Sequence, residues 1–355
     1  MKIKAILLVG LVSLFSGCAA VSPDQAGYTE DTDSSLVSTE VFESYGSIDV
    51  QAGTPEKPVT MTLWYARPEN LKPDTPVLLV MHGGRRDADV YRDYWGTYAE
   101  KYDVLIVAPE VSNEDFPTGW GYQAGNWITA DSSSFDASKG ERNPPEQSSF
   151  AAVERAFDEL RKEFDLTAEK YDIWGHGSGA QFVHRMLMLW PEARVNTAIA
   201  ANAGTYTFPD YSLPLRYGLK NTGATADDLS NAYAHHLVIM LGTDDDDPSH
   251  RLLNLSDIAK AQGAHRLEKG KKFYQVSRAK AEELGAEFNW EVQTVYGVGH
   301  SGRKMAVAGA DFLLAGEKEE PLFSSDSDTE SGDRGKESNP LLQGTEEGDD
   351  PFGDY

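Results

Sequence analysis

Three residue types that carry out nucleophilic catalysis each follow a short apolar run in this sequence. Ser178 lies in a glycine-rich turn, Asp245 lies within a run of four aspartates, and His300 follows Gly299. A serine hydroxyl attacks a carbonyl when an imidazole takes its proton, and a carboxylate orients that imidazole. The sequence therefore predicts a hydrolytic site with Ser178, His300 and Asp245 as its catalytic candidates.

The turn around Ser178 raises a question about which residue occupies the nucleophile position. A nucleophile elbow is a tight strand-to-helix turn with small residues two positions before and after the nucleophile. Around position 177 both of these residues are glycine, Gly175 and Gly179, whereas around position 178 the preceding one is His176. The pattern therefore predicts Gly177 at the nucleophile position and Ser178 at the start of the next helix.

The aspartate run offers several candidates for the acid. Asp245 is favoured because it lies three residues after Gly242, the glycine at the end of a predicted strand. Asp244 or Asp247 could take its place. The run could also be a solvated turn or a weak calcium site, because clustered carboxylates suit both.

A second glycine-rich stretch, His82-Gly83-Gly84, follows an earlier apolar run. Backbone N–H groups there could face the negative charge that develops on a carbonyl oxygen under attack. We predict Gly83, Gly84 and Arg85 as one half of an oxyanion hole. Arg85 and Arg86 could also attract a carboxylate, or simply pair with nearby acidic residues.

The elements that would hold these residues alternate between strand-like and helix-like segments. The predicted helices include 148–164, 179–189 and 271–284. The predicted strands are 59–65, 77–81, 104–108, 171–174, 198–201, 237–241 and 290–296. Such alternation predicts an α/β fold with a mainly parallel central sheet and helices on both faces. Ligands of these folds bind beyond the carboxyl ends of the strands, where the three candidates lie.

Two long connections, 111–146 and 205–235, are rich in glycine, proline and aromatic residues. Connections of this length are often functional, so we expect them to form the walls of a cleft. Aromatic residues in such loops can alternatively serve as packing residues. The candidate cleft residues are Trp120, Tyr122, Asn126, Trp127, Tyr206 and Tyr211.

Six motifs in order give the chain a family resemblance across about residues 60–315. They are His82 to Gly84, Gly119 to Asn126, Gly175 to Arg185, Asn202 to Tyr206, Gly242 to Pro248 and Gly297 to Gly302. The chain resembles α/β-hydrolases of the polyhydroxybutyrate-depolymerase and feruloyl-esterase-like group. The resemblance implies the α/β-hydrolase fold and ester hydrolysis by a Ser-His-Asp triad. It also implies serine at position 177, where this chain has glycine.

Two functional hypotheses follow. In one, the chain binds an ester, acyl or glycan-linked ligand, or hydrolyses it weakly, because Gly177 cannot attack. In the other, it is an active esterase or depolymerase-like hydrolase that uses Ser178 with His300 and Asp245. No cofactor or metal is predicted: Gly175-x-Gly177-x-x-Ala180 matches a dinucleotide fingerprint, but no acidic residue ends the next strand to bind the ribose.

Composition limits the classes of partner. The 355 residues carry a net charge of −25. Nucleic acid is therefore not expected as a partner, since phosphate binding needs clustered basic residues. The single cysteine excludes an internal disulfide.

That cysteine, Cys18, follows two lysines and an apolar run, as in a bacterial lipoprotein signal. We predict an exported lipoprotein of the cell envelope, held to the membrane by lipid on Cys18, and Ala19 favours the outer membrane. The predicted parts are a signal peptide (1–17), a lipidated acidic tether (18–45), an α/β-hydrolase domain (46–315) and a disordered acidic tail (316–355). The partner of the tail, if it has one, is unknown.

Overall fold

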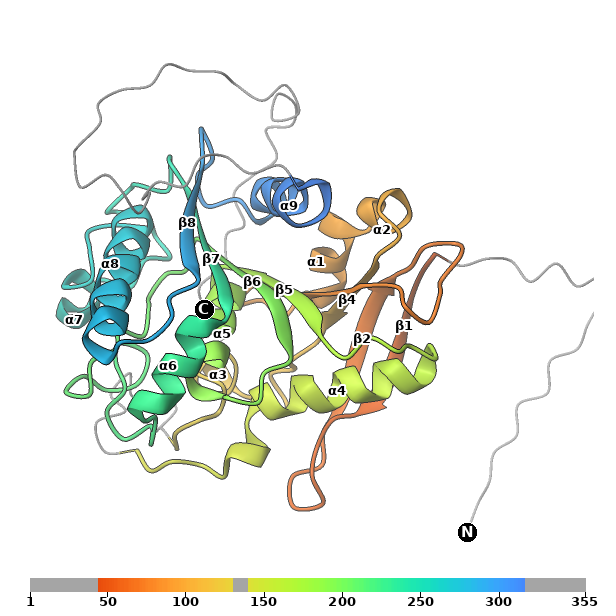
Figure 1. Cartoon of the computed structure of the whole chain (residues 1–355), viewed down its shortest axis with the longest axis horizontal. Coiled ribbons are helices and arrows are strands. Elements are labelled where there is room, and N and C mark those ends of the chain that lie inside the picture. Colours follow the sequence, from red (N-terminus) through yellow and green to blue (C-terminus); the bar gives the residue numbers. More distant parts are fainter. Residues whose placement is uncertain (1–43, 130–139, 317–355) are drawn as a thin grey trace, which may run out of the picture. The chain divides into compact units, whose positions relative to one another are not determined.

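The computed structural model describes residues 44–129 and 140–316, and these form one eight-stranded sheet with helices on both sides (Figure 1). The strand order is β1-β2-β4-β3-β5-β6-β7-β8. β2 is antiparallel to both of its neighbours, β1 and β4, and all other neighbouring strands are parallel. The strands are β1 (Tyr45–Gln51), β2 (Thr60–Ala66), β3 (Val77–Met81), β4 (Leu105–Pro109), β5 (Tyr171–His176), β6 (Val195–Ala201), β7 (His236–Gly242) and β8 (Trp290–Val295).

The helices cover the sheet in two layers. Helices α1 and α9 pack on one face of the sheet, and helices α4, α5, α6 and α8 pack on the other (Figure 1). The helices are α1 (Ala88–Trp95), α2 (Thr97–Lys101), α3 (Thr118–Gly121), α4 (Ser149–Glu163), α5 (Ser178–Leu189), α6 (Ala226–Ala234), α7 (Asp257–Lys260), α8 (Arg266–Leu284) and α9 (Gly302–Ala310). The predicted fold class is confirmed.

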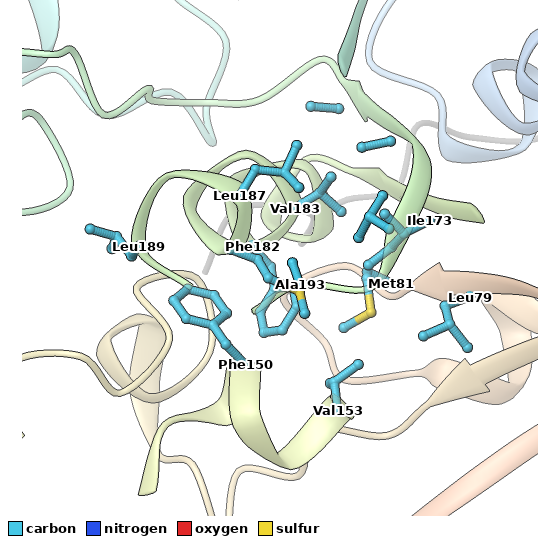
Figure 2. Packing of buried hydrophobic residues seen from close by; sticks show 14 of the residues in the cluster. Leu79, Met81, Phe150, Val153, Ile173, Phe182, Val183, Leu187, Leu189 and Ala193 are labelled. Atoms are coloured by element: carbon cyan, nitrogen blue, oxygen red, sulfur yellow. The ribbon is translucent and has the colours of Figure 1, made fainter. Parts of the chain in front are cut away.

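The central strands are buried because helices cover both of their faces. All five residues of β3 are buried, and alternate side chains enter opposite cores. Leu79 and Met81 join the cluster with Phe182 of α5 and Phe150 of α4 (Figure 2). Every residue of α5 is likewise buried, so the helix that follows the glycine-rich turn is fixed within the core.

Several elements differ from the sequence-based prediction. β1 was not predicted, and α8 begins at Arg266 rather than at residue 271. Residues 1–43 and 317–355, which contain the predicted signal peptide, Cys18 and almost all of the predicted tether and tail, lie outside the described residues. In the ranges that the structure describes, no helix is both long enough and apolar enough to cross a membrane.

Candidate active site

The turn between β5 and α5 has a single residue at its apex, Gly177. β5 ends at His176, α5 begins at Ser178, and Gly177 between them has φ 55° and ψ −109°. A positive φ favours glycine, because a β-carbon there is strained. The turn is anchored by the Gly177 N–H, which donates to the carbonyl of Ala201 at the end of β6 (3.0 Å).

The glycines on either side of the apex allow the strand and the helix to approach closely. A β-carbon on Gly175 would lie 2.4 Å from the backbone carbon of Gly179, and one on Gly179 would lie 2.3 Å from the Met81 carbonyl oxygen. Side chains therefore do not fit two positions before or two positions after Gly177. This is the steric pattern of a nucleophile elbow centred on residue 177.

His300 and Asp245 come together at the carboxyl ends of β8 and β7. His300 Nδ1 lies 2.9 Å from Asp245 Oδ2, and both side chains are buried. The second nitrogen, His300 Nε2, is buried and has no hydrogen-bond partner among the described residues. The pair thus presents an imidazole that is oriented by a carboxylate and whose other nitrogen is available to a reacting group.

Arg266 completes a buried charge cluster around this acid. Its Nη1 donates to Asp245 Oδ1 over 3.1 Å, and the two side chains are 1% and 4% exposed. Burial by itself raises the pKa of Asp245. The hydrogen bond from His300 and the charges of His300 and Arg266 outweigh it and lower that pKa to about 2. Asp245 is therefore a carboxylate at neutral pH.

Asn202 joins the loops that carry the acid and the base. Its Oδ1 accepts from the Gly242 N–H at the end of β7 (2.8 Å), and its Nδ2 donates to the Gly299 carbonyl (3.1 Å). The sequence analysis assigned no role to Asn202 or Arg266. A polar residue directly after a buried strand is the signal that could have identified Asn202, since the carboxyl ends of parallel strands share one edge of the sheet.

Ser178 belongs to a different hydrogen-bond network from His300. Its side chain is fully buried, and its Oγ accepts from Gln123 Nε2 over 2.6 Å. The Gln123 Oε1 accepts in turn from Arg216 Nη2 (2.6 Å). Since His300 Nε2 has no hydrogen-bond partner in the described part of the chain, the structure does not bring the Ser178 hydroxyl into hydrogen bonding with His300. The sequence analysis missed Gln123.

His176 packs directly against the base. Its ring lies between Trp174 (6.4 Å between ring centroids) and His300 (4.4 Å). Burial, together with the nearby charge of His300, holds the pKa of His176 well below its usual range. Neither of its ring nitrogens has a hydrogen-bond partner in the described part of the chain. His176 is thus a neutral ring that supports one side of His300.

The loop after β3 lies beside the elbow, since Gly179 packs against the Met81 carbonyl. Its His82 side chain accepts from the Val111 N–H through Nε2 (3.1 Å) and lies 2.9 Å from the Gly83 carbonyl through Nδ1. Tyr122 donates to the His82 carbonyl over 2.6 Å. The predicted oxyanion residues Gly83, Gly84 and Arg85 follow directly, so these hydrogen bonds of His82 hold the start of their segment in place.

The predicted cleft residues lie deeper than expected. Tyr122 and Tyr206 are 1% and 0% exposed, and Tyr206 stacks on Phe273 of α8 (4.7 Å between centroids). The packing role, which the sequence left open as the alternative for these aromatic residues, agrees with this burial. Trp120 is also buried, at 7% exposed, and the Asn126 side chain donates to the Gln147 carbonyl (3.1 Å).

The strand order, the glycine-centred elbow and the His–Asp pair at the strand ends together define an α/β-hydrolase. No family model and no curated protein matches the sequence. Among solved structures, the chain is similar to poly(aspartic acid) hydrolase-1 from Sphingomonas sp. KT-1, with 36% identity, 78% of this chain and 100% of that chain covered, and a TM-score of 0.70. It is also similar to LpqC, a poly(3-hydroxybutyrate) depolymerase from Bordetella parapertussis, with 30% identity, 78% and 92% covered, and a TM-score of 0.70. The chain belongs to the polyhydroxybutyrate-depolymerase-like group of the α/β-hydrolases.

Proposed function

We propose that this hydrolase-like protein binds ester or acyl ligands at the elbow and forms no acyl-enzyme with them, so that hydrolysis is weak at most. The observation that carries the proposal is Gly177 at the apex of the turn, with the oriented His300 still in place. Without a side chain at position 177 there is no covalent nucleophile. The His–Asp pair and the oxyanion loop can still receive a polarised carbonyl.

The alternative, an esterase that uses Ser178, finds less support. A nucleophilic serine has to give its proton to the base, which requires a distance of roughly 3 Å. Ser178 Oγ accepts from Gln123 instead, and His300 Nε2 has no hydrogen-bond partner within residues 44–129 and 140–316. We therefore assign to Ser178 the start of α5, and an N–H directed towards the oxyanion hole.

The relatives support a carbonyl ligand. One is a poly(aspartic acid) hydrolase and the other a poly(3-hydroxybutyrate) depolymerase, and both polymers have backbones joined through carbonyl groups. We propose a ligand with an ester or related acyl bond for this chain as well. We also propose that Cys18 carries lipid and holds the domain at the cell envelope, with fatty-acid labelling of a Cys18→Ser variant as the test.

The test of the binding proposal measures binding and turnover on the same sample. The whole protein is incubated with a trimer of 3-hydroxybutyrate, binding is followed by ligand-observed NMR, and products are separated by chromatography. We expect saturable binding and recovery of intact trimer. Turnover at rates typical of enzymes, on the order of 1 s⁻¹ or more, that is lost in a Ser178→Ala variant would establish the esterase instead.

A further inference from the structure

The base of the site is complete, although the residue at the nucleophile position has no side chain. Asp245 is a carboxylate at neutral pH, because its pKa is about 2, and it accepts a hydrogen bond from His300 Nδ1 over 2.9 Å. The proton of a neutral His300 ring therefore lies on Nδ1, and Nε2 carries the lone pair of a base. Nε2 is buried and has no hydrogen-bond partner in the ranges 44–129 and 140–316. His300 can thus accept a proton from a hydroxyl group that reaches Nε2.

The elbow is held in shape around Gly177. The Gly177 N–H donates to the Ala201 carbonyl (3.0 Å), and Gly175 and Gly179 let the strand and the helix on either side pack closely. Serine at this position, which the family resemblance implies, would add one CH₂OH group. Water and methanol carry the same hydroxyl on a molecule of about the size of that group or smaller. A small hydroxyl compound can therefore supply the reacting group that position 177 lacks.

The neighbouring Ser178 hydroxyl is held by other contacts. Its Oγ accepts from Gln123 Nε2 (2.6 Å), and Gln123 Oε1 accepts in turn from Arg216 Nη2 (2.6 Å). Every residue of α5 is buried, so packing also holds the first turn of this helix. The nucleophile for a bound carbonyl therefore has to come from solution.

We propose that the site transfers the acyl group of a bound ester directly to a small hydroxyl acceptor, water or methanol, with His300 as the general base. The inference rests on the proposed function for the binding of the ester. It adds a slow reaction that passes through no acyl-enzyme, and it names the acceptor class.

The bonds and the proton balance in two stages. The acceptor oxygen forms a bond to the carbonyl carbon while its proton passes to His300 Nε2, and the oxyanion loop faces the negative charge on the carbonyl oxygen. The bond from that carbon to the alkoxy oxygen then breaks, and the alkoxy oxygen takes the proton from His300. Water yields a carboxylic acid and the alcohol of the ester, and methanol yields a methyl ester and that alcohol. Aryl esters should react fastest, because a phenol is a better leaving group than an alkyl alcohol.

The experiment uses the whole protein and 4-nitrophenyl butyrate. Release of 4-nitrophenol is followed by absorbance, and methyl butyrate formed in the presence of methanol is measured by gas chromatography. The wild type is compared with His300→Gln, and with His236→Gln as a matched control for ester cleavage by any imidazole of the surface. His236 is partly exposed, pairs with Glu291 and starts β7, at the end of that strand opposite the site.

A second measurement needs no variant and so does not depend on the folding of His300→Gln. The wild type is treated with a fluorophosphonate, freed of excess reagent and assayed again. Because this reagent blocks activated serines, direct transfer to water should continue at the same rate. Binding of the 3-hydroxybutyrate trimer is measured on the same preparation, so that binding and reaction are judged separately.

We expect saturable release of 4-nitrophenol without an initial burst, at a rate below about 1 s⁻¹. His300→Gln should lower the rate by about a hundredfold, which is within the range for a general base, and His236→Gln should leave it unchanged. Methanol should give methyl butyrate, and the fluorophosphonate should have no effect.

The opposite results separate this inference from the proposed function. Binding of the trimer, together with a rate that does not depend on His300 or with no methyl butyrate, would overturn the inference and leave the proposed function standing. A burst that the fluorophosphonate abolishes would overturn both, because it would reveal an acyl-enzyme. Absence of binding and of turnover would also overturn both.

Discussion

Replacement of Asp245 by asparagine changes one charge in a cluster that the protein has fully buried. Asp245 accepts from Arg266 and contacts His300 Nδ1. Asparagine keeps the shape and can accept one of these hydrogen bonds. It removes the negative charge that lies 3.1 Å from the Arg266 guanidinium, which is 1% exposed.

The expected loss of stability is about 3 kcal/mol, the lower end of the range for breaking a buried ion pair from one side. For a domain of this size that corresponds to a decrease in Tm of about 6–12 °C. The dependence of stability on acidic pH should report the same interaction of Asp245 with Arg266 and His300. The folded-state pKa of Asp245 is about 2, below that of an unfolded aspartate at about 3.9. Its stabilisation is thus complete above pH ~4 and is lost as the pH falls towards 2, by about 2–3 kcal/mol in total.

The assay is thermal and urea unfolding of the wild type and Asp245→Asn between pH 7 and pH 3. The variant should begin with a lower Tm and should lose less stability on acidification than the wild type. Asp246→Asn is the matched control, because the neighbouring side chain is exposed, and it should unfold at the wild-type temperature. An Asp245→Asn variant with an unchanged Tm and the wild-type acid slope would refute the buried charge cluster.

Three further substitutions test the packing around the elbow, each by urea unfolding. Gly179→Ala should destabilise the fold by about 1–3 kcal/mol, because its β-carbon has to displace the backbone at the end of β3; an unchanged midpoint would contradict the close approach. Gln123→Ala removes the amide that donates to Ser178 Oγ and should cost about 1–3 kcal/mol; full stability would show that this bond contributes nothing. His176→Phe keeps an aromatic ring in place and removes two buried nitrogens that have no hydrogen-bond partner among the described residues. Its stability should therefore stay within about 1 kcal/mol of the wild type or rise; a larger loss would reveal a partner for His176.

The central strands could be predicted from sequence because burial on both faces leaves a continuous apolar run. The run at 77–81 matches β3 residue for residue. β1 was missed because it is an edge strand in which exposed and half-buried residues alternate, so it carries little apolar signal.

In the site, Asp245 and His300 could be identified from local spacing, and the structure brings them into contact. Asp245 was favoured by its distance from Gly242, and it is the acid that meets His300. Arg266 and Gln123 were missed because they reach the site from α8 and from the loop after α3, and no local pattern reports such contacts. The sequence left two roles open for Tyr206, because an aromatic residue in a long loop gives no sign of whether it lines a surface or enters the core.

The most direct test of the central claim is intact and peptide mass spectrometry after treatment with a fluorophosphonate. In the native protein we predict no adduct, on Ser178 or elsewhere in the site. In Gly177→Ser we predict a stoichiometric adduct at position 177, since a hydroxyl there meets the oriented His300, although the strained backbone should cost about 1–3 kcal/mol of stability. An adduct on Ser178 of the native protein would contradict the account, and so would a folded Gly177→Ser variant that remains unlabelled.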